Sequence, residues 1–212
     1  MITKHQVHNL IILDESGSMQ SIKATIISGF NELVQTMKGV ESEFPEQEHF
    51  ITLVTFNGLG RKTLMDKEPV SKLTLIDENK YQPDASTPLY DAMGDSFCKL
   101  RKDLEKVKDH NVLVTILTDG EENASKEYTG AAIKSLIEEL KQKNWTFTYI
   151  GTDHDVEKFA ISISITNSMV FDKNEAGIKN MFDKEKSARR GYSEKIRNNE
   201  STSDDFYIDT KK

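Results

Sequence analysis

The sequence of 212 residues contains one cysteine, Cys98, and only four prolines. A single cysteine forms no intrachain disulfide, and no cysteine–histidine cluster has the spacing of a zinc site. No apolar stretch has the ~20 residues that a membrane span needs. The first residues, MITKHQVHN, lack the apolar region of a signal peptide. We therefore expect a cytoplasmic protein with no membrane partner.

An excess of basic residues is also missing, since the formal net charge at pH 7 is −7. Nucleic-acid binding favours a basic surface, so we expect no nucleic-acid partner. Neither a G-x-G-x-x-G segment nor a Walker loop follows a strand, which argues against a nucleotide site. The segment GSMQS lacks the second glycine of the serine-hydrolase motif.

What the sequence does contain is a regular alternation of apolar strands and amphipathic helices. Apolar runs predict strands at 7–13, 50–56, 111–118, 145–151 and 168–172. Apolar residues at three- and four-residue steps predict helices that begin near Ile22 and at 87–107, 126–144, 155–163 and 174–190. Residues 60–70 are polar and end near Pro69, so any strand there is expected at an edge of the sheet.

This order of elements predicts an α/β fold with a mostly parallel sheet and helices on both faces. Residues 1–187 are expected to form one domain. The polar residues 188–212 are expected to form a C-terminal tail, in which the segment DFYI is the part that could dock on the domain.

Polar side chains follow the two most apolar strands. NLIILDESGSM carries Asp14, Ser16 and Ser18, and NVLVTILTDGEEN carries Asp119. In an open parallel sheet, ligands bind outside the carboxyl ends of the strands, and Thr87 in the loop before the second helix can reach the same edge. Carboxylate and hydroxyl oxygens without histidine or cysteine select a hard cation, which is Mg²⁺, Mn²⁺ or Ca²⁺.

The number of carboxylates in this set is informative. Two aspartates do little more than balance a divalent ion, whereas neutral hydroxyls fill coordination positions without adding negative charge. Such an ion stays electrophilic and can accept an acidic side chain from another molecule. A site with four carboxylates would repel that side chain.

Three ordered motifs resemble those of the von Willebrand factor A domain family. DESGS matches its Asp-x-Ser-x-Ser motif, DASTPLYDAM resembles its threonine loop, and LTDGEEN resembles its strand-terminal aspartate. The resemblance spans residues 5–185 and implies a Rossmann-like three-layer sandwich with about six strands, one of them an antiparallel edge strand. It also implies an intact metal-ion-dependent adhesion site, with the ligands Asp14, Ser16, Ser18, Thr87 and Asp119. In this family the ion commonly bridges to an Asp or Glu of a protein partner.

Each of these residues also has a purely structural interpretation. Ser18 or Ser21 could cap the helix that begins near Ile22, Thr87 could cap the second helix before Pro88, and Asp119 could belong to a turn. Of the other acidic residues nearby, Glu121 and Glu122 are expected to be exposed. The segment GTDHD, residues 151–155, is expected to form a loop and a helix cap.

The sequence therefore favours a non-enzymatic protein-binding module that holds one divalent cation, most favourably Mg²⁺. Two alternatives stay open. One is a Mg²⁺-dependent phosphohydrolase, although Ser16 stands where the dehalogenase-like Asp-x-Asp motif needs its second aspartate. The other is an assembly subunit of an ATPase-linked complex, in which a separate protein would supply the ATP site.

Overall fold

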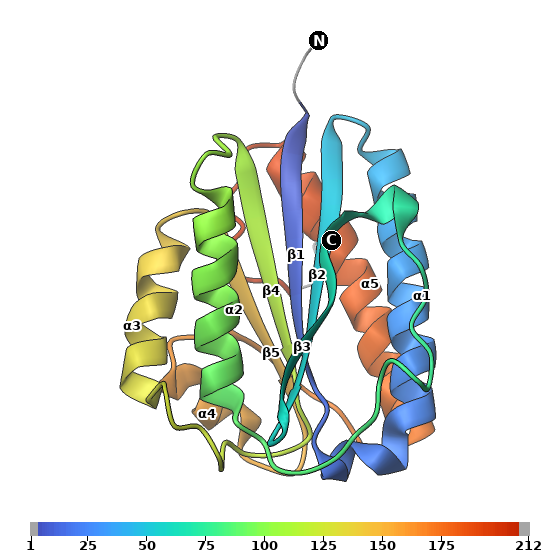
Figure 1. Cartoon of the computed structure of the whole chain (residues 1–212). Helices are drawn as coiled ribbons and strands as arrows, with labels where there is room; N and C mark the ends of the chain where they lie inside the picture. The colour runs from blue at the N-terminus through green and yellow to red at the C-terminus, as the bar shows by residue number, and fades with distance from the viewer. Residues whose placement is uncertain (1–3, 208–212) are drawn as a thin grey trace.

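A computed structural model describes residues 4–207, which form a six-stranded sheet between two layers of helices (Figure 1). The strands are β1 (His5–Asp14), β2 (Gln47–Asn57), β3 (Gly60–Pro69), β4 (His110–Leu117), β5 (Trp145–Gly151) and β6 (Asn167–Val170). The helices are α1 (Lys23–Glu43), α2 (Leu89–Leu104), α3 (Gly130–Lys141), α4 (Val156–Ser162) and α5 (Glu175–Arg197). Two short 3-10 helices are η1 (Gly17–Ile22) and η2 (Val70–Lys72). The predicted α/β sandwich is confirmed.

The strand order in the sheet is β3-β2-β1-β4-β5-β6. All neighbouring pairs are parallel except β2 and β3, which are antiparallel. The strand predicted from residues 60–70 therefore lies at an edge, as expected for a polar segment that ends in proline. The strand that follows β1 in the chain, β2, pairs with one edge of β1, whereas β4 pairs with the other edge. The connection that leaves β1 and the connection that leaves β4 therefore run in opposite directions along the sheet.

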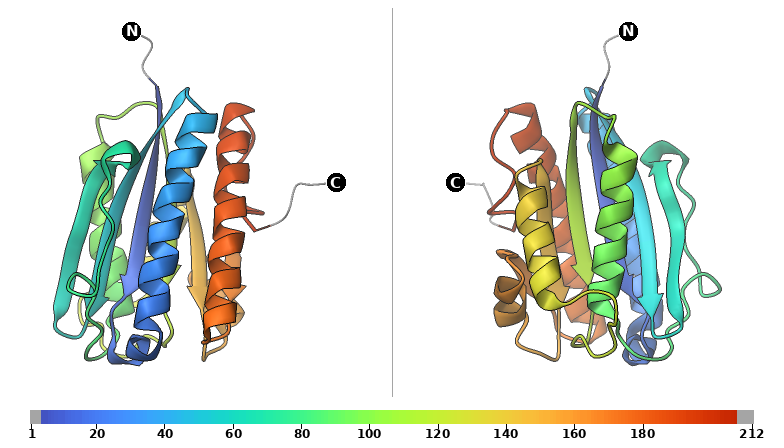
Figure 2. Two further views of the ribbon diagram at one scale, coloured as in Figure 1. Left: turned by 90° about the vertical axis from the view of Figure 1, so that its right-hand side faces the viewer. Right: turned by 60° about the vertical axis from the view of Figure 1, so that its left-hand side comes forward.

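The sheet is covered on both faces because its central strands are apolar on both faces. In β1, Leu10 and Ile12 pack with the layer of α2, α3 and α4. Ile11 and Leu13 pack with the layer of α1 and α5. All four side chains are at most 4% exposed. Figure 2 shows α1 and α5 side by side on one face of the sheet. A strand buried on both faces reads as a continuous apolar run, which is why the sequence identified it.

The structure differs from the expected C-terminal tail. Helix α5 passes the boundary at residue 188 and ends at Arg197. Residues 198–207 then fold back, and Phe206 is buried against Val7 and Tyr192. The tail was predicted from polar composition, but Arg189 and Ser193 are polar residues on the buried side of α5. Of the segment DFYI, Ile208 lies outside the described residues.

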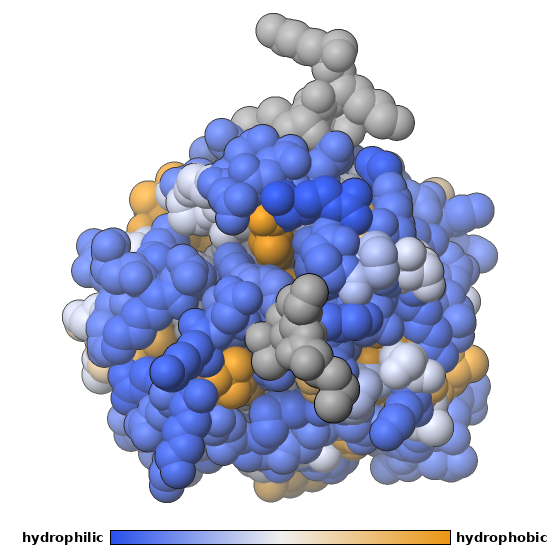
Figure 3. Space-filling view, turned by 90° about the horizontal axis from the view of Figure 1, so that it is seen from above, coloured by the Kyte–Doolittle hydropathy of each residue, from blue (hydrophilic) through white to orange (hydrophobic). Residues whose placement is uncertain are grey.

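The predicted ligands lie at one end of the sheet, opposite the end where β1 begins. Figure 3 shows the end where β1 begins, which polar side chains largely cover, with hydrophobic residues only in separate spots. The strands β1 and β4 terminate at the opposite end, where the predicted ligands lie. Among residues 4–207, no helix is long and apolar enough to cross a membrane.

Candidate metal centre

The predicted ligands meet at the carboxyl edge of the sheet, between β1 and β4. Asp14 is the last residue of β1, and Asp119 follows β4 by two residues. Thr87 lies just before α2. Because the connections diverge between β1 and β4, no crossover covers this edge, and the position is the usual binding crevice of an open parallel sheet.

A chain of hydrogen bonds joins the first motif to the third. The Ser16 backbone N–H donates to Asp14 Oδ1 over 2.7 Å. The hydroxyls of Ser16 and Ser18 are 3.1 Å apart, and the Ser18 hydroxyl donates to Asp119 Oδ1 over 2.6 Å. Asp14, Ser16 and Asp119 are buried, whereas Ser18 is exposed at the surface of the cluster. Two carboxylates and two hydroxyls from distant parts of the chain are thus in direct contact.

Asp14 forms the floor of this cluster. Its side chain is fully buried, and its second oxygen, Oδ2, accepts a hydrogen bond from the Thr118 hydroxyl over 2.6 Å. Burial is the main cause that raises the pKa of Asp14 to about 6, although the hydrogen bonds from Thr118 and Ser16 lower it and the charge of Asp119 raises it. The folded protein therefore disfavours the ionised form of Asp14, which a nearby cation would favour.

Thr87 is held by the loop that follows Asp119. Its backbone N–H donates to Asn123 Oδ1 over 3.0 Å, and its carbonyl accepts from the Asn123 N–H over 3.2 Å. A Cβ atom added to Gly120 would lie 3.8 Å from Thr87 Oγ1, so this hydroxyl faces the residue next to Asp119. Thr87 is 3% exposed, and within residues 4–207 its hydroxyl takes part in no hydrogen bond.

The loop after β1 is fixed to the loop before α2. The Gly17 N–H donates to the Ala85 carbonyl over 3.0 Å, and the Asp84 N–H donates to the Glu15 carbonyl over 2.9 Å. The Tyr81 hydroxyl donates to the Asp14 carbonyl over 2.6 Å. These contacts place the first and second motifs side by side without using the side chains of the predicted ligands.

The residues at the helix N-caps are not the ones that a purely structural role of Ser18, Ser21 or Thr87 would require. Helix α1 has Ile22 at its N-cap, and η1 has Ser16 there, in both cases without a side-chain hydrogen bond. Helix α2 has Pro88 rather than Thr87 at its N-cap. The hydroxyls of the two motifs are therefore not engaged in capping, and they remain available to a ligand.

The other acidic residues near this edge have structural roles. Glu121 is exposed as expected, but the expectation for Glu122 is wrong. Glu122 is half-buried and accepts from the backbone N–H groups of Tyr90, Ala124 and Ser125 over 2.7–2.8 Å. It is therefore an anchor between its loop and α2.

In the segment GTDHD, Asp155 caps α4 by accepting from the Lys158 N–H over 3.2 Å, as expected. Asp153 is exposed and is not a cap. Its carboxylate lies 3.6 Å from Lys173 Nζ.

Lys173 was not anticipated from the sequence. Its Nζ lies 2.6 Å from Asp119 Oδ2, a buried oxygen that accepts no hydrogen bond from residues 4–207. Burial lowers the pKa of Lys173, but Asp119 and Asp153 together raise it above the ordinary value, so the side chain is a cation. A single lysine after a short strand carries no pattern by which the sequence could have marked it.

The donor set fits a hard divalent cation. Among residues 4–207, no three His, Cys, Asp or Glu side chains gather in a metal-binding arrangement. The candidate centre has two carboxylates, and the three hydroxyls of Ser16, Ser18 and Thr87 complete an all-oxygen set. Among residues 4–207, the only polar partner of the buried Asp119 Oδ2 is the Lys173 ammonium, so this oxygen already faces a positive charge.

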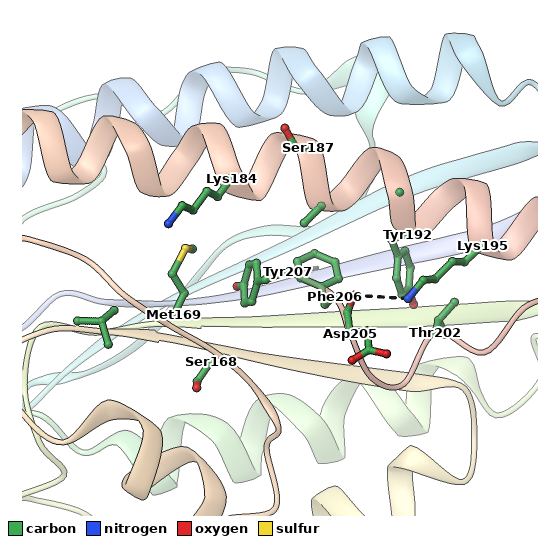
Figure 4. Close-up of a pocket in the computed structure, with 13 residues that line it drawn as sticks. Ser168, Met169, Lys184, Ser187, Tyr192, Lys195, Thr202, Asp205, Phe206 and Tyr207 are labelled. Carbon is green, nitrogen blue, oxygen red and sulfur yellow. Dashed lines mark hydrogen bonds between the residues drawn. The ribbon is translucent and has the colours of Figure 1, made fainter. Parts of the chain in front are cut away.

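A separate hollow of about 450 Å³ lies between β6 and α5. Figure 4 shows Met169 on β6 pointing toward Lys184 on α5, with Tyr207 and Phe206 beside this pair. Its Lys195 already donates to the carbonyl oxygens of Asp204 and Asp205. This hollow has no oxygen cluster like that of the candidate centre.

The fold is a von Willebrand A-like α/β sandwich, and solved structures support this class. The D319A mutant of the PilB minor pilin from Streptococcus sanguinis matches with 13% identity and a TM-score of 0.62 over 92% of this chain. The chain spans 63% of that PilB chain.

Two further matches are individual domains. The vWF domain of the type V pili tip protein Mfa5 from Porphyromonas gingivalis matches with 12% identity and a TM-score of 0.57, over 92% of this chain and 96% of that one. The SpRpn10 VWA domain matches with 12% identity and a TM-score of 0.52, over 84% and 94%. No family model matches the sequence, and no curated protein matches it. At these identities the likeness concerns the fold alone.

Proposed function

We propose that the chain is a protein-binding module whose candidate centre holds one divalent cation, most favourably Mg²⁺. The observation that carries this proposal is the convergence of Asp14, Ser16, Ser18, Thr87 and Asp119 at one sheet edge, with hydroxyls that cap no helix. When bound, the cation would supply an electrophilic contact for an Asp or Glu side chain of a protein partner. The resemblance of the three motifs to an intact metal-ion-dependent adhesion site supports the same assignment.

The charges of the centre support an acidic partner group. Asp14 and Asp119 balance a divalent ion, and the three hydroxyls add no charge. The exposed Ser18 lies at the surface, whereas the carboxylates are buried beneath it, so an incoming group meets the neutral side of the cluster. The net charge of −7 supports a protein rather than a nucleic acid as the partner. The expected cytoplasmic location stays a prediction.

A module that binds proteins agrees with the kinds of structure that share the fold, which include a minor pilin, a pilus tip protein and the SpRpn10 VWA domain. The phosphohydrolase alternative is less well supported. Ser16 stands where the dehalogenase-like Asp-x-Asp motif needs its second aspartate, which would be the proton-shuttling acid. The ATPase-linked alternative stays a prediction, because it concerns a second protein.

The first test is calorimetric titration of chelator-treated protein with Mg²⁺, Mn²⁺ and Ca²⁺. We expect saturable one-site binding by the wild type that is lost in Asp119→Ala and in Asp14→Ala. The matched control is Glu121→Ala, which removes an exposed carboxylate two residues from Asp119 and should leave binding unchanged. Binding that survives in Asp119→Ala would contradict the assigned centre, and so would its absence in the wild type.

The second test concerns the partner. Proteins retained on the immobilised wild type with Mg²⁺, and released by chelator, should be absent with Asp14→Ala. In a partner identified in this way, one Asp or Glu→Ala substitution should abolish retention. Retention that persists in excess chelator would contradict the metal-dependent mechanism.

A further inference from the structure

Lys173 lies at the candidate centre, although it belongs to none of the three motifs. Its Nζ is 2.6 Å from Asp119 Oδ2 and 3.6 Å from a carboxylate oxygen of Asp153. The Asp119 side chain is fully buried, and that of Lys173 is 23% exposed. The contact therefore joins a buried carboxylate to an ammonium that reaches in from the rim of the site.

The segment that carries Lys173 is anchored on both sides. Before it, the Phe171 N–H donates to the Gly151 carbonyl at the end of β5 over 3.1 Å, and Phe171 is buried. After it, Asn174 caps α5 by accepting from the Gly177 N–H over 2.9 Å. The backbone on each side of Lys173 is thus held by the sheet and by the helix, so the lysine reaches Asp119 from a defined position.

The ammonium contacts the oxygen that a divalent cation would also need. Asp119 Oδ1 is engaged by Ser18, and Oδ2 faces Lys173. A divalent ion among the proposed ligands would lie within a few ångströms of Lys173 Nζ, and the two cations would repel each other. Asp153 is exposed and lies near enough to receive the ammonium when it leaves Asp119.

We infer that Lys173 is an internal counter-cation, which competes with the divalent cation for Asp119 and thereby sets the metal affinity of the centre. This inference rests on the proposed function, because it concerns occupancy of the same centre. Lys173 does not bind the metal itself, and it acts only through its ion pair with the Asp119 carboxylate. The metal-free protein keeps Asp119 neutralised, and metal binding requires the transfer of the ammonium from Asp119 to Asp153.

The experiment is calorimetric titration of the full chain, freed of metal by chelator, with Mg²⁺ and Mn²⁺. The test variant is Lys173→Met, which keeps the length of the side chain and removes its charge. Lys173→Arg keeps the charge, and Lys184→Met removes an exposed lysine from α5 on the side of the hollow. We expect Lys173→Met to tighten binding by about tenfold or more, with the two control variants near the wild type.

A second readout shows that each variant is folded. Saturating Mg²⁺ should raise the Tm of Lys173→Met by more than it raises the Tm of the wild type, because the variant has lost the competing cation. In chelator, Lys173→Met should have a lower Tm than the wild type, and this difference should shrink in an Asp119→Asn background.

The outcomes separate the inference from the proposed function. Equal or weaker metal binding by Lys173→Met than by the wild type would overturn the inference and leave the proposed function intact. Binding by Lys173→Met but not by the wild type would support the inference and would contradict the proposal that the wild-type centre holds a cation. If neither protein binds metal, the inference and the proposed function both fail.

Discussion

Two buried polar clusters lie on this sheet, and they differ in completeness. Beneath α5, Arg189 is 3% exposed and Glu185 is 1% exposed. Arg189 donates to Glu185 over 3.0 Å, to Asn9 over 2.8 Å and to Thr115 over 2.6 Å. The second oxygen of Glu185 accepts from the Tyr207 hydroxyl over 2.6 Å. One positive charge meets one negative charge, and each side chain is hydrogen-bonded.

The candidate metal centre lacks this balance. The partly exposed Lys173 ammonium pairs with Asp119 and Asp153, and Asp14 has no cationic partner among residues 4–207. Buried charges are normally paired, so an excess of one carboxylate over cations is compatible with the proposed divalent ion. The comparison thus contrasts a charge-balanced buried cluster with one that carries excess negative charge.

The largest expected effect on stability comes from removing one charge of the buried Arg189–Glu185 pair. Arg189→Met leaves the buried Glu185 without a counter-charge, and we expect it to lower the free energy of unfolding by about 3–5 kcal/mol. Urea denaturation at pH 7 measures this loss. The double variant Arg189→Met/Glu185→Leu removes both charges and should recover most of it. A double variant as unstable as the single one would show that the charge balance is not what matters there.

A smaller effect of opposite sign is expected at the candidate centre. The pKa of Asp14 is raised from its ordinary value of 3.8 to about 6, so its ionised form opposes folding above pH 6. This penalty disappears as the pH falls below 3.8, where Asp14 is mostly protonated in both the folded and the unfolded state. In chelator, Asp14→Asn should therefore raise the free energy of unfolding by up to about 3 kcal/mol at pH 8.

Urea denaturation of the wild type and Asp14→Asn in chelator at pH 8 and at pH 5 checks this sign. The gain should shrink at pH 5, and saturating Mg²⁺ at pH 8 should stabilise the wild type alone. If Asp14→Asn were destabilised equally at both pH values, the hydrogen bonds from Ser16 and Thr118 would outweigh the burial of the charge.

The smallest effect concerns one donor of the complete cluster. Tyr207→Phe removes the hydroxyl that donates to Glu185, and we expect a loss of about 1.5 kcal/mol in the free energy of unfolding. The matched control is Arg190→Ala, because Arg190 is a neighbour of Arg189 in an exposed ion pair with Glu43 and should change stability by about 0.5 kcal/mol or less. If the two variants changed the free energy of unfolding equally, the buried contact of Tyr207 would contribute no more to stability than the exposed ion pair of Arg190.

The sequence predicted most of the sheet and indicated that Asp14 and Asp119 lie at one edge of it. The physical reasons for these two predictions differ. Strands such as β1 and β4 are buried on both faces and are therefore apolar throughout. The residues Asp14 and Asp119 stood out because they follow those runs directly. Thr87 was placed by its motif, although the structure caps α2 with Pro88 instead.

The supporting residues were beyond the reach of sequence patterns. Tyr81 and Lys173 approach the centre from loops, and their contacts depend on how distant segments pack. The second half of α5 was mistaken for a tail because its buried positions include Arg189 and Ser193. These two polar residues occupy buried positions of the helix, where an apolar residue is normally expected, so the apolar pattern that identifies a helix in the sequence is lost there.

The order of these residues along the chain has a consequence for synthesis. The proposed ligands extend from Asp14 to Asp119, and Lys173 follows them by more than fifty positions. A chain that emerges from the ribosome with its N-terminus first exposes both carboxylates before their internal counter-ion has been made. During synthesis, Mg²⁺ could therefore reach the two carboxylates before Lys173 has been made. The competition between Mg²⁺ and Lys173 for Asp119 would begin only after the last helix has folded.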